Sequence, residues 1–596
     1  MRPRNTLFGL ISGLLSLSLT LGGLSLVQAV AKRDARPGKL SASLRAAVAE
    51  GRTTRVIIQA VAGQSSFVAN GIGNAGAQIN DVVDTGDTVA ATVTPAHLSA
   101  LEADPNVVLV TEDRQIAVTG HLENTTGASL VRPSESPKFD PTAPTIAIID
   151  SGIDPNHQAF RSQSSKSRII GSVDFSGEGD TLDHFGHGTF VAAIAAGNGH
   201  FNDAATGIDP SANLLNVKVI DSTGSSRMSQ AIRAIEWCIK NRVAYNIGVI
   251  NISFGAPATD SYKIDPLCRS VRRAVDAGLV VVVAAGNMGK DYGGDKVYGG
   301  IQTPGIEPSA LTVGAVNTFG TDFRSDDVVA TYSSRGPTRG FTVDAAGNKI
   351  YDGLAKPDIV APGNKIISAE ANNSVLIQQN PGLDLSTNRD AKQAVMQMSG
   401  TSVATPAVSG AAALLLDLNP NLTPNLTKAA LMYTAQPLRN ANYLEQGSGL
   451  LDVEGAYRLV SSFKTNIGSL KTGDRLTNGS LPAQYSYIAG EKITWSQTIV
   501  VGSGSASGTP LISRYQGVYA DGVLYSDGVL YTDGVLYTDG VLYTDGVLYT
   551  DGVLYTDGVL YTDGVLYTDG VLYSDGVLYS DGVLYTDSIL VRGDPT

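Results

Sequence analysis

Short apolar runs recur along the chain from about residue 140, separated by polar and helix-like stretches. They read TIAIID, LLNVKVI, GVINISF, LVVVVAA, LTVGAV and DIVAPG. The runs are continuous rather than alternating, which is typical of strands buried on both faces of a sheet. Between two of them, Met228, Ile232, Ile235 and Ile239 recur at helical spacing. The pattern predicts an α/β domain with a doubly wound, mainly parallel sheet, and such sheets bind ligands at the carboxyl ends of their strands.

A smaller block of apolar runs precedes this domain. Residues 55–118 contain three strand-like runs, RVIIQAV, TVAATV and VVLVTEDRQIAV. The stretch TPAHLSALEADPNV reads as a short helix with Pro at its first turn. We therefore expect a small α+β domain within residues 50–120.

The N-terminus has two arginines, then a long apolar stretch, and then QAVA, a segment with small residues of the kind that precede a signal-peptide cleavage site. This is the pattern of a secretory signal peptide over residues 1–31, with cleavage after Ala29 or Ala31. An uncleaved membrane anchor is the alternative. We expect a secreted, extracellular protein (or a cell-surface or periplasmic one) with no membrane span after signal removal.

The C-terminal part of the chain changes composition twice. Residues 463–515 are rich in Gly, Ser and Thr, which predicts a small linker or β region. Residues 516–590 hold eleven copies of DGVLY at a period of six. Asp-Gly turns favour a hairpin meander, the even period favours a stacked β-solenoid, and a disordered tail is the third reading. In each case the tract is expected to contact a cell surface or to associate with itself.

Charge is concentrated in this repeat. The net charge is −13, and residues 521–587 carry twelve Asp without Lys or Arg. The rest of the chain is nearly neutral and has no basic footprint for nucleic acid. Cys238 and Cys268 are the only cysteines, and a disulfide and two buried thiols both remain open.

Four polar residues stand at the ends of predicted elements in the α/β domain: Asp150, His187, Asn287 and Ser402. Each could instead have a purely structural role, in a turn, as a helix cap or in the core. Asp154 and His184 lie nearby and are weaker candidates. The order Asp, His, Ser within one α/β domain is one of the chain orders of serine hydrolases.

Three blocks make the chain resemble the subtilase family of serine proteases: AIIDSGID, GHGTFVAAIAAG and SGTSVATP. The stretches NISFG, VVVAAGN, SSRGP and KPDIVAPG support the resemblance. It covers residues 140–460 and implies a subtilisin-like catalytic domain, which we place at residues 125–462.

The resemblance implies a role for each candidate. Ser402 would attack the peptide carbonyl while His187 removes its proton. Asp150 would orient the imidazole, and Asn287 would donate to the oxyanion. No cofactor is required for this chemistry and no metal ligand is assigned, while structural calcium stays open.

Substrate-binding walls are implied by the same resemblance. They contain no charged side chain, so we expect apolar or aromatic side chains to be preferred at P1, the residue before the cleaved bond. The wall residues are Ser253, Phe254, Gly255, Ala284, Ala285 and Gly286.

The N-terminal block resembles the inhibitory propeptide of subtilases, particularly in HLSALEADPNVVLVTED. It would assist folding and then block the cleft of its own protease, and we expect self-cleavage within residues 117–126. The chain is thus predicted to be a secreted serine endopeptidase that acts on proteins and peptides through an acyl-enzyme and is made as a zymogen. A surface adhesive or spacer protein with an inactive protease-like domain is the alternative. A triad esterase is disfavoured because the G-x-S-x-G elbow is missing.

Overall fold

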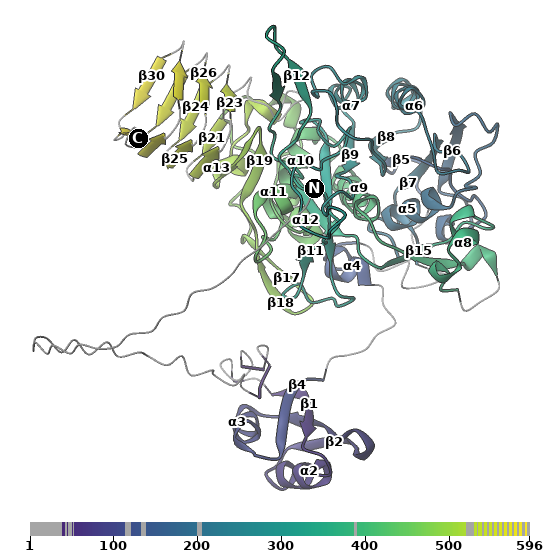
Figure 1. Ribbon diagram of the computed structural model, residues 1–596, viewed down its shortest axis with the longest axis vertical. Helices are drawn as coiled ribbons and strands as arrows, with labels where there is room; N and C mark the ends of the chain where they lie inside the picture. Colours follow the sequence, from purple (N-terminus) through teal and green to yellow (C-terminus); the bar gives the residue numbers. More distant parts are fainter. Residues whose placement is uncertain are drawn as a thin grey trace, which may run out of the picture. The chain divides into compact units, whose positions relative to one another are not determined.

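The chain divides into two units, Met1–Ala117 and Val118–Thr596, in a computed structural model (Figure 1). The structure describes residues 39–41, 44–45, 51, 53–113, 121–132, 139–199, 206–386 and 390–519, and the strands alone between 530 and 592. The expected signal peptide lies outside the described residues, as do residues 117–120 of the expected cleavage region.

The first unit has the order βαββαβ. Its elements are β1 (Thr54–Ala60), α2 (Ser65–Asn74), β2 (Gln78–Val83), β3 (Thr88–Val93), α3 (Pro95–Ala103) and β4 (Val107–Glu112). The antiparallel sheet has the order β2-β3-β1-β4. Its core contains Val56, Ile58, Val89 and Leu98. The predicted α+β organisation is present, and α2 and β2 are additional to the predicted elements.

The main sheet of the second unit has the order β11-β10-β9-β8-β5-β7-β6, with β14 beside β10. All neighbouring pairs are parallel except β10 and β11. The predicted doubly wound sheet is therefore confirmed. The strands are β5 (Thr145–Asp150), β6 (Ile169–Asp174), β7 (Asn213–Lys218), β8 (Ile247–Ile252), β9 (Val280–Ala284), β10 (Leu311–Asn317), β11 (Val328–Val329) and β14 (Ile359–Pro362).

Helices cover both faces of this sheet (Figure 1). Along β5, Ile146 and Ile148 belong to the core that contains α5 and α9, while Ala147 and Ile149 belong to the core that contains α6 and α7. This explains the continuous apolar runs, because successive side chains enter different cores. The helices are α4 (His121–Thr125), α5 (His187–Ala196), α6 (Met228–Asn241), α7 (Pro266–Asp276), α8 (Val375–Gln379), α9 (Thr401–Leu418), α10 (Pro424–Thr434), α11 (Tyr443–Gln446) and α12 (Val453–Ser461).

Strand β5 lies at the switch point of the sheet. The chain next forms β6 and β7 on one side of β5, and then β8, β9 and β10 on the other. Loops that leave the carboxyl end of the sheet in opposite directions open a crevice there. The hairpins β12 (Phe341–Val343) with β13 (Lys349–Tyr351) and β15 (Ile366–Ala369) with β16 (Val395–Met398) complete this part of the chain.

Helix α9 is the one described helix that is long and apolar enough to cross a membrane, and it is mostly buried inside the unit. Its buried length reflects its position in the centre of the fold, against α5 and the strands β8, β9 and β10. Both cysteines are buried as free thiols, so the structure contains no bond between Cys238 and Cys268.

Residues 463–519 form short strands and share the core that contains α9 and α10. Trp495, Ile499, Leu511 and Tyr519 belong to the same buried cluster as α9 and α10. The elements are β17 (Tyr485–Ile488), β18 (Glu491–Thr494), β19 (Thr498–Val501), β20 (Gly504–Ser507) and α13 (Pro510–Ser513). This segment therefore packs as part of the main body.

The repeat forms strands β21 (Leu530–Thr532) to β31 (Leu590–Arg592). Each strand from β21 to β28 pairs in parallel with the strand eighteen residues later, as Val535 does with Val553. Three parallel stacks result, which is the pairing of a three-sided solenoid and not of a hairpin meander. Strand β22 (Val535–Thr538) pairs with β20, so one stack continues a sheet of the main body (Figure 1).

Candidate active site

Asp150 and His187 meet at the carboxyl end of β5. Asp150 is fully buried, and its Oδ1 accepts hydrogen bonds from the backbone N–H of Ser151 and from His187 Nδ1, both at 2.8 Å. A carboxylate can only accept, so this contact assigns a proton to Nδ1 and leaves Nε2 as the basic nitrogen of the neutral imidazole. The pair has the geometry of a base and the acid that orients it.

His187 is the first residue of α5. Its side chain is 15% exposed, so part of it is accessible to solvent. Burial alone would lower the pKa of His187, but the charge and hydrogen bond of Asp150, with a further contribution from Asp183, raise that pKa above its ordinary value. A protonated imidazolium at His187 would thus be stabilised.

Ser402 is the second residue of α9, which packs against α5. Its side chain is partly exposed. A Cβ on the preceding Gly400 would stand 3.0 Å from Ser402 Oγ and 3.5 Å from Asn287 Nδ2. The hydroxyl and the amide nitrogen therefore flank the same small space. Among the hydrogen bonds of the described residues, none joins Ser402 to His187, and such contacts often tighten only around substrate.

Asn287 follows β9 and is exposed. Its Oδ1 accepts hydrogen bonds from the N–H of Thr401 at 2.9 Å and from the hydroxyl of Thr401 at 3.1 Å. The Thr401 oxygen in turn accepts from the N–H of Gly286 at 3.1 Å. With its oxygen held in this way, the amide presents Nδ2 as a donor beside Ser402. Thr401, the residue before Ser402, thereby holds the amide that lies beside the Ser402 hydroxyl.

The expected substrate walls come from the ends of β8 and β9. Ser253 is held by Asn251, whose amide donates to Ser253 Oγ at 2.9 Å and accepts from Ser409. Phe254 is half-buried and Gly255 is exposed. Ala284 is buried, and Ala285 lies in a cluster with Tyr262, Cys268 and Ile301.

Gln302 lies between the two walls. A Cβ on Gly286 would stand 2.7 Å from Gln302 Oε1, and a Cβ on Gly255 would stand 3.2 Å from the same atom. The two glycines therefore give the space that this side chain occupies. The likeness to the subtilase family suggests a pocket floor near Gln302, and the fold brings this side chain against both walls.

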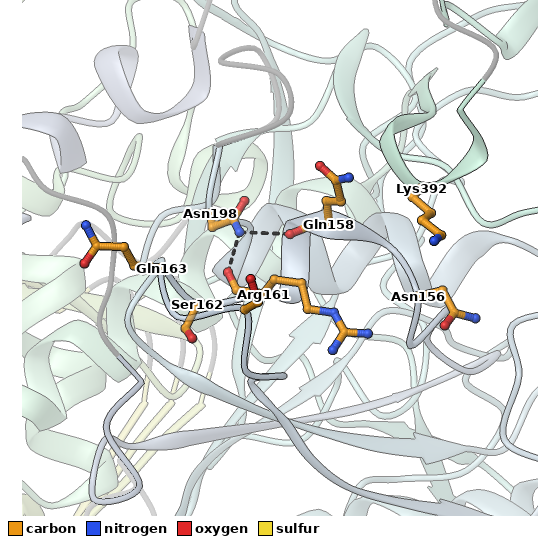
Figure 2. Close-up of a pocket in the computed structure, with 8 residues that line it drawn as sticks. Asn156, Gln158, Arg161, Ser162, Gln163, Asn198 and Lys392 are labelled. Atoms are coloured by element: carbon orange, nitrogen blue, oxygen red, sulfur yellow. Dashed lines mark hydrogen bonds between the residues drawn. The ribbon is translucent and has the colours of Figure 1, made fainter.

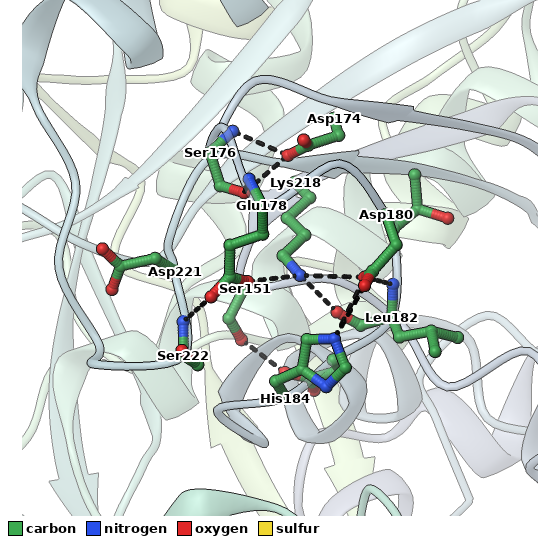
Figure 3. Close-up of polar contacts among 12 residues, drawn as sticks. Ser151, Asp174, Ser176, Glu178, Asp180, Leu182, His184, Lys218, Asp221 and Ser222 are labelled. Atoms are coloured by element: carbon green, nitrogen blue, oxygen red, sulfur yellow. Dashed lines mark hydrogen bonds and ion pairs between the residues drawn. The ribbon is translucent and has the colours of Figure 1, made fainter.

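A buried lysine holds the loop that precedes His187 (Figure 3). Lys218, paired with Asp150 across β7 and β5, contacts Glu178 at 2.8 Å, Asp180 at 3.3 Å and the carbonyl of Leu182 at 2.7 Å. Burial opposes ionisation of Glu178, but hydrogen bonds from Lys218 and Ser222 lower its pKa to about 2. His184, the weaker candidate, contacts Asp180 at 3.0 Å and lies outside the Asp150–His187 pair.

A separate polar pocket is lined by Asn156, Gln158, Arg161, Asn198 and Lys392 (Figure 2). The amide of Asn198 donates to the Gln158 carbonyl at 2.9 Å. None of the four predicted site residues lines it. Among the described residues, no group of three His, Cys, Asp or Glu side chains could hold a metal ion.

Comparison with known proteins points to one family. The model of the subtilase family matches residues 142–455. The chain is 34% identical over 383 residues to serine protease AprX of Bacillus subtilis, covering 62% of this chain and 78% of that protein. It is 33% identical over 373 residues to subtilisin E of the same species, covering 62% and 80%. Among solved structures, Sphericase aligns at 24% identity with a TM-score of 0.42, over 57% of this chain and all of that one.

Proposed function

Because this chain belongs to the subtilase family of serine proteases, we propose that it is a secreted endopeptidase that uses Asp150, His187 and Ser402 as its triad. The contact between His187 Nδ1 and Asp150 Oδ1 is the observation that carries the proposal. It pairs the fully buried acid with a base at the start of a helix that packs against the helix of Ser402.

The chemistry follows from these positions. Ser402 Oγ attacks the peptide carbonyl as His187 Nε2 takes its proton, and Asp150 stabilises the imidazolium that forms. The oxyanion receives hydrogen bonds from Asn287 Nδ2 and the backbone N–H of Ser402. His187 then protonates the leaving amine, and water releases the acyl group from Ser402 by the same steps in reverse.

The specificity pocket is proposed to favour apolar or aromatic P1 side chains. Support comes from the walls, Ser253–Gly255 and Ala284–Gly286, which carry no charged side chain. The Gln302 amide between Gly255 and Gly286 would limit the depth of the pocket and offer a hydrogen bond at its base.

Autoprocessing is proposed to occur just before His121. His121 contacts Asp322 at 2.9 Å, and Arg324 donates to the carbonyl of Thr125 at 3.0 Å, so residues 121–125 are already held by the catalytic unit. We propose that residues 50–120 act as the inhibitory propeptide. N-terminal mass spectrometry of active enzyme tests this, since an intact 32–130 segment would contradict it.

The repeat is proposed to act outside the catalytic step, by contacting a cell surface or another copy of the chain. Its continuous pairing with β20 supports a role as a stiff extension of the main body. Deletion of residues 521–596 is expected to reduce attachment to cells or self-association while casein hydrolysis persists.

One comparison tests the proposed activity. Wild-type protein is expected to react with a fluorophosphonate serine probe and to hydrolyse casein, and Ser402→Ala is expected to do neither. If wild-type protein fails in both assays, the inactive adhesive or spacer function is favoured instead.

A further inference from the structure

A second buried carboxylate lies behind the catalytic histidine. Asp183 is 4% exposed and stands four residues before His187. Its Oδ1 accepts from the hydroxyl of Ser151 and the N–H of Gly186, and its Oδ2 accepts from the N–H of Thr189, all at 2.7 Å. All three of these partners are donors, so the site accommodates the ionised carboxylate.

Ser151 joins this carboxylate to the triad. Its N–H donates to Asp150 Oδ1 at 2.8 Å, its hydroxyl donates to Asp183, and its oxygen accepts from the N–H of Gly188 at 2.9 Å. Three N–H groups around the start of α5 are thus held, directly or through Ser151, by Asp183. The end of β5 and the first turn of α5 become one hydrogen-bonded assembly.

The packing leaves this assembly little freedom. A Cβ on Gly188 would stand 2.2 Å from the carbonyl oxygen of Gly152, and a Cβ on Gly152 would stand 2.7 Å from the carbonyl oxygen of Leu182. Gly152 also has φ +114°, in the region that favours glycine. The backbones that carry Asp150, Asp183 and His187 therefore approach as closely as glycine permits.

We propose that Asp183 is a positioning residue for catalysis: through Ser151 and the first N–H groups of α5 it holds His187 against Asp150, and its charge stabilises the imidazolium. This inference rests on the proposed protease function. It assigns a reason to a buried acid that does not touch substrate or the reacting atoms.

The electrostatic part follows from the charges around the ring. The charged groups that act on His187 are Asp150, on β5, and Asp183, in the loop before α5. Burial raises the pKa of Asp183, while its hydrogen bonds from Thr189, Gly186 and Ser151 oppose that rise. Replacing Asp183 with a neutral amide should therefore lower the pKa of His187.

The kinetic test uses the full chain, processed and titrated with the serine probe so that only competent active sites are counted. Asp183→Asn is expected to lower kcat by roughly 10- to 100-fold with KM little changed, the size expected for a small displacement of a catalytic group. The acid limb of the pH profile, in which kcat/KM rises as His187 loses its proton, should move to lower pH. Ser151→Ala should lower kcat in the same direction by less.

Asp452→Asn is the matched control. Asp452 is a fully buried aspartate that accepts from the N–H of Gly455 at the start of α12, which carries no triad residue. This variant should lose stability without moving the acid limb. The inference would be overturned if Asp183→Asn kept the wild-type kcat and the wild-type pH dependence of kcat/KM. It would also be overturned if Asp452→Asn shifted that pH dependence as much as Asp183→Asn does.

A second measurement separates this inference from the activity itself. In the Ser402→Ala background, the imidazole of His187 is titrated by NMR with and without Asp183→Asn. A lower pKa of His187 in the double variant supports the inference even if wild-type enzyme proves inactive, and an unchanged pKa contradicts it. If Asp183→Asn does not fold, Ser151→Ala takes its place in both experiments. A loss of kcat in Ser151→Ala then supports the positioning role. A wild-type kcat with an unchanged acid limb of the kcat/KM profile contradicts it.

Discussion

Removing the amide of Asn287 gives the sharpest test of the proposed oxyanion site. In Asn287→Ala the Nδ2 donor beside Ser402 is lost, while the triad contact between Asp150 and His187 is untouched. Loss of one such donor costs about 2.7–4 kcal/mol in the transition state, or about 10²–10³ in kcat, a magnitude measured for this kind of donor in a subtilisin. KM should change little, because the donor acts mainly on the charge that develops during attack.

The structure also predicts what should not change. Asn287 is exposed, and the groups it leaves unpaired are the N–H and hydroxyl of Thr401, which lie at the start of α9. Thr401 is itself buried, but the exposed Asn287 side chain vacates space that is open to solvent, so water can replace the lost acceptor and the free energy of unfolding should fall by only about 1 kcal/mol. The increase in the activation free energy of catalysis should therefore be about three times the decrease in the free energy of unfolding.

The assay is steady-state hydrolysis of a chromogenic peptide, normalised by active-site titration, with thermal unfolding measured in parallel. Asn287→Asp keeps the acceptor for Thr401 but replaces the donor with a charge, so it should lose more activity than Asn287→Ala. If Asn287→Ala keeps more than about a third of wild-type kcat, or loses activity only through KM, the oxyanion assignment is refuted.

Four further predictions concern the same site. Because the pKa of His187 is raised, kcat/KM should rise with pH through a midpoint above 6.5, and a midpoint below 6.5 in the wild-type profile would contradict this expectation. Asp150→Asn should lower kcat by about 10⁴. Gly400→Ala places a Cβ 3.0 Å from Ser402 Oγ and should lower kcat about tenfold with normal folding by circular dichroism, whereas full activity would mean that the hydroxyl has room to move. Gln302→Gly should raise kcat/KM for Phe over Ala at P1, measured on paired peptide substrates, and an unchanged ratio would show that Gln302 does not limit the pocket.

The sequence alone determined the strands and the order of the chemistry. The apolar runs that predict β5, β7, β8, β9, β10 and β14 are long and continuous, so burial on both faces was encoded locally. Asp150, His187 and Asn287 stand at or just beyond such elements, where the end of a strand or the start of a helix is visible in the letters themselves.

Helix α6 shows where local pattern is not enough. The large apolar residues predict a face with Met228, Ile232, Ile235 and Ile239, yet Met228 is 39% exposed while Ala231, Ala234 and Cys238 are buried. Small residues allow the helix to approach the sheet closely, and which face does so depends on partners far away in the chain. The repeat is similar: a period of six predicts short strands, but only the three-dimensional winding pairs each strand with the one eighteen residues later.

Only the tertiary structure decided which polar groups support the site. Thr401 holds the amide oxygen of Asn287, Gln302 enters the space left by Gly255 and Gly286, and Asp183 reaches Ser151 from another loop. These are contacts between segments that are separate in sequence, so they exist only once the domain has folded, and burial strengthens those that lie away from water. The local sequence can indicate a candidate nucleophile, base and acid at the ends of strands and helices. The packing of the whole domain determines which other residues hold these three in position.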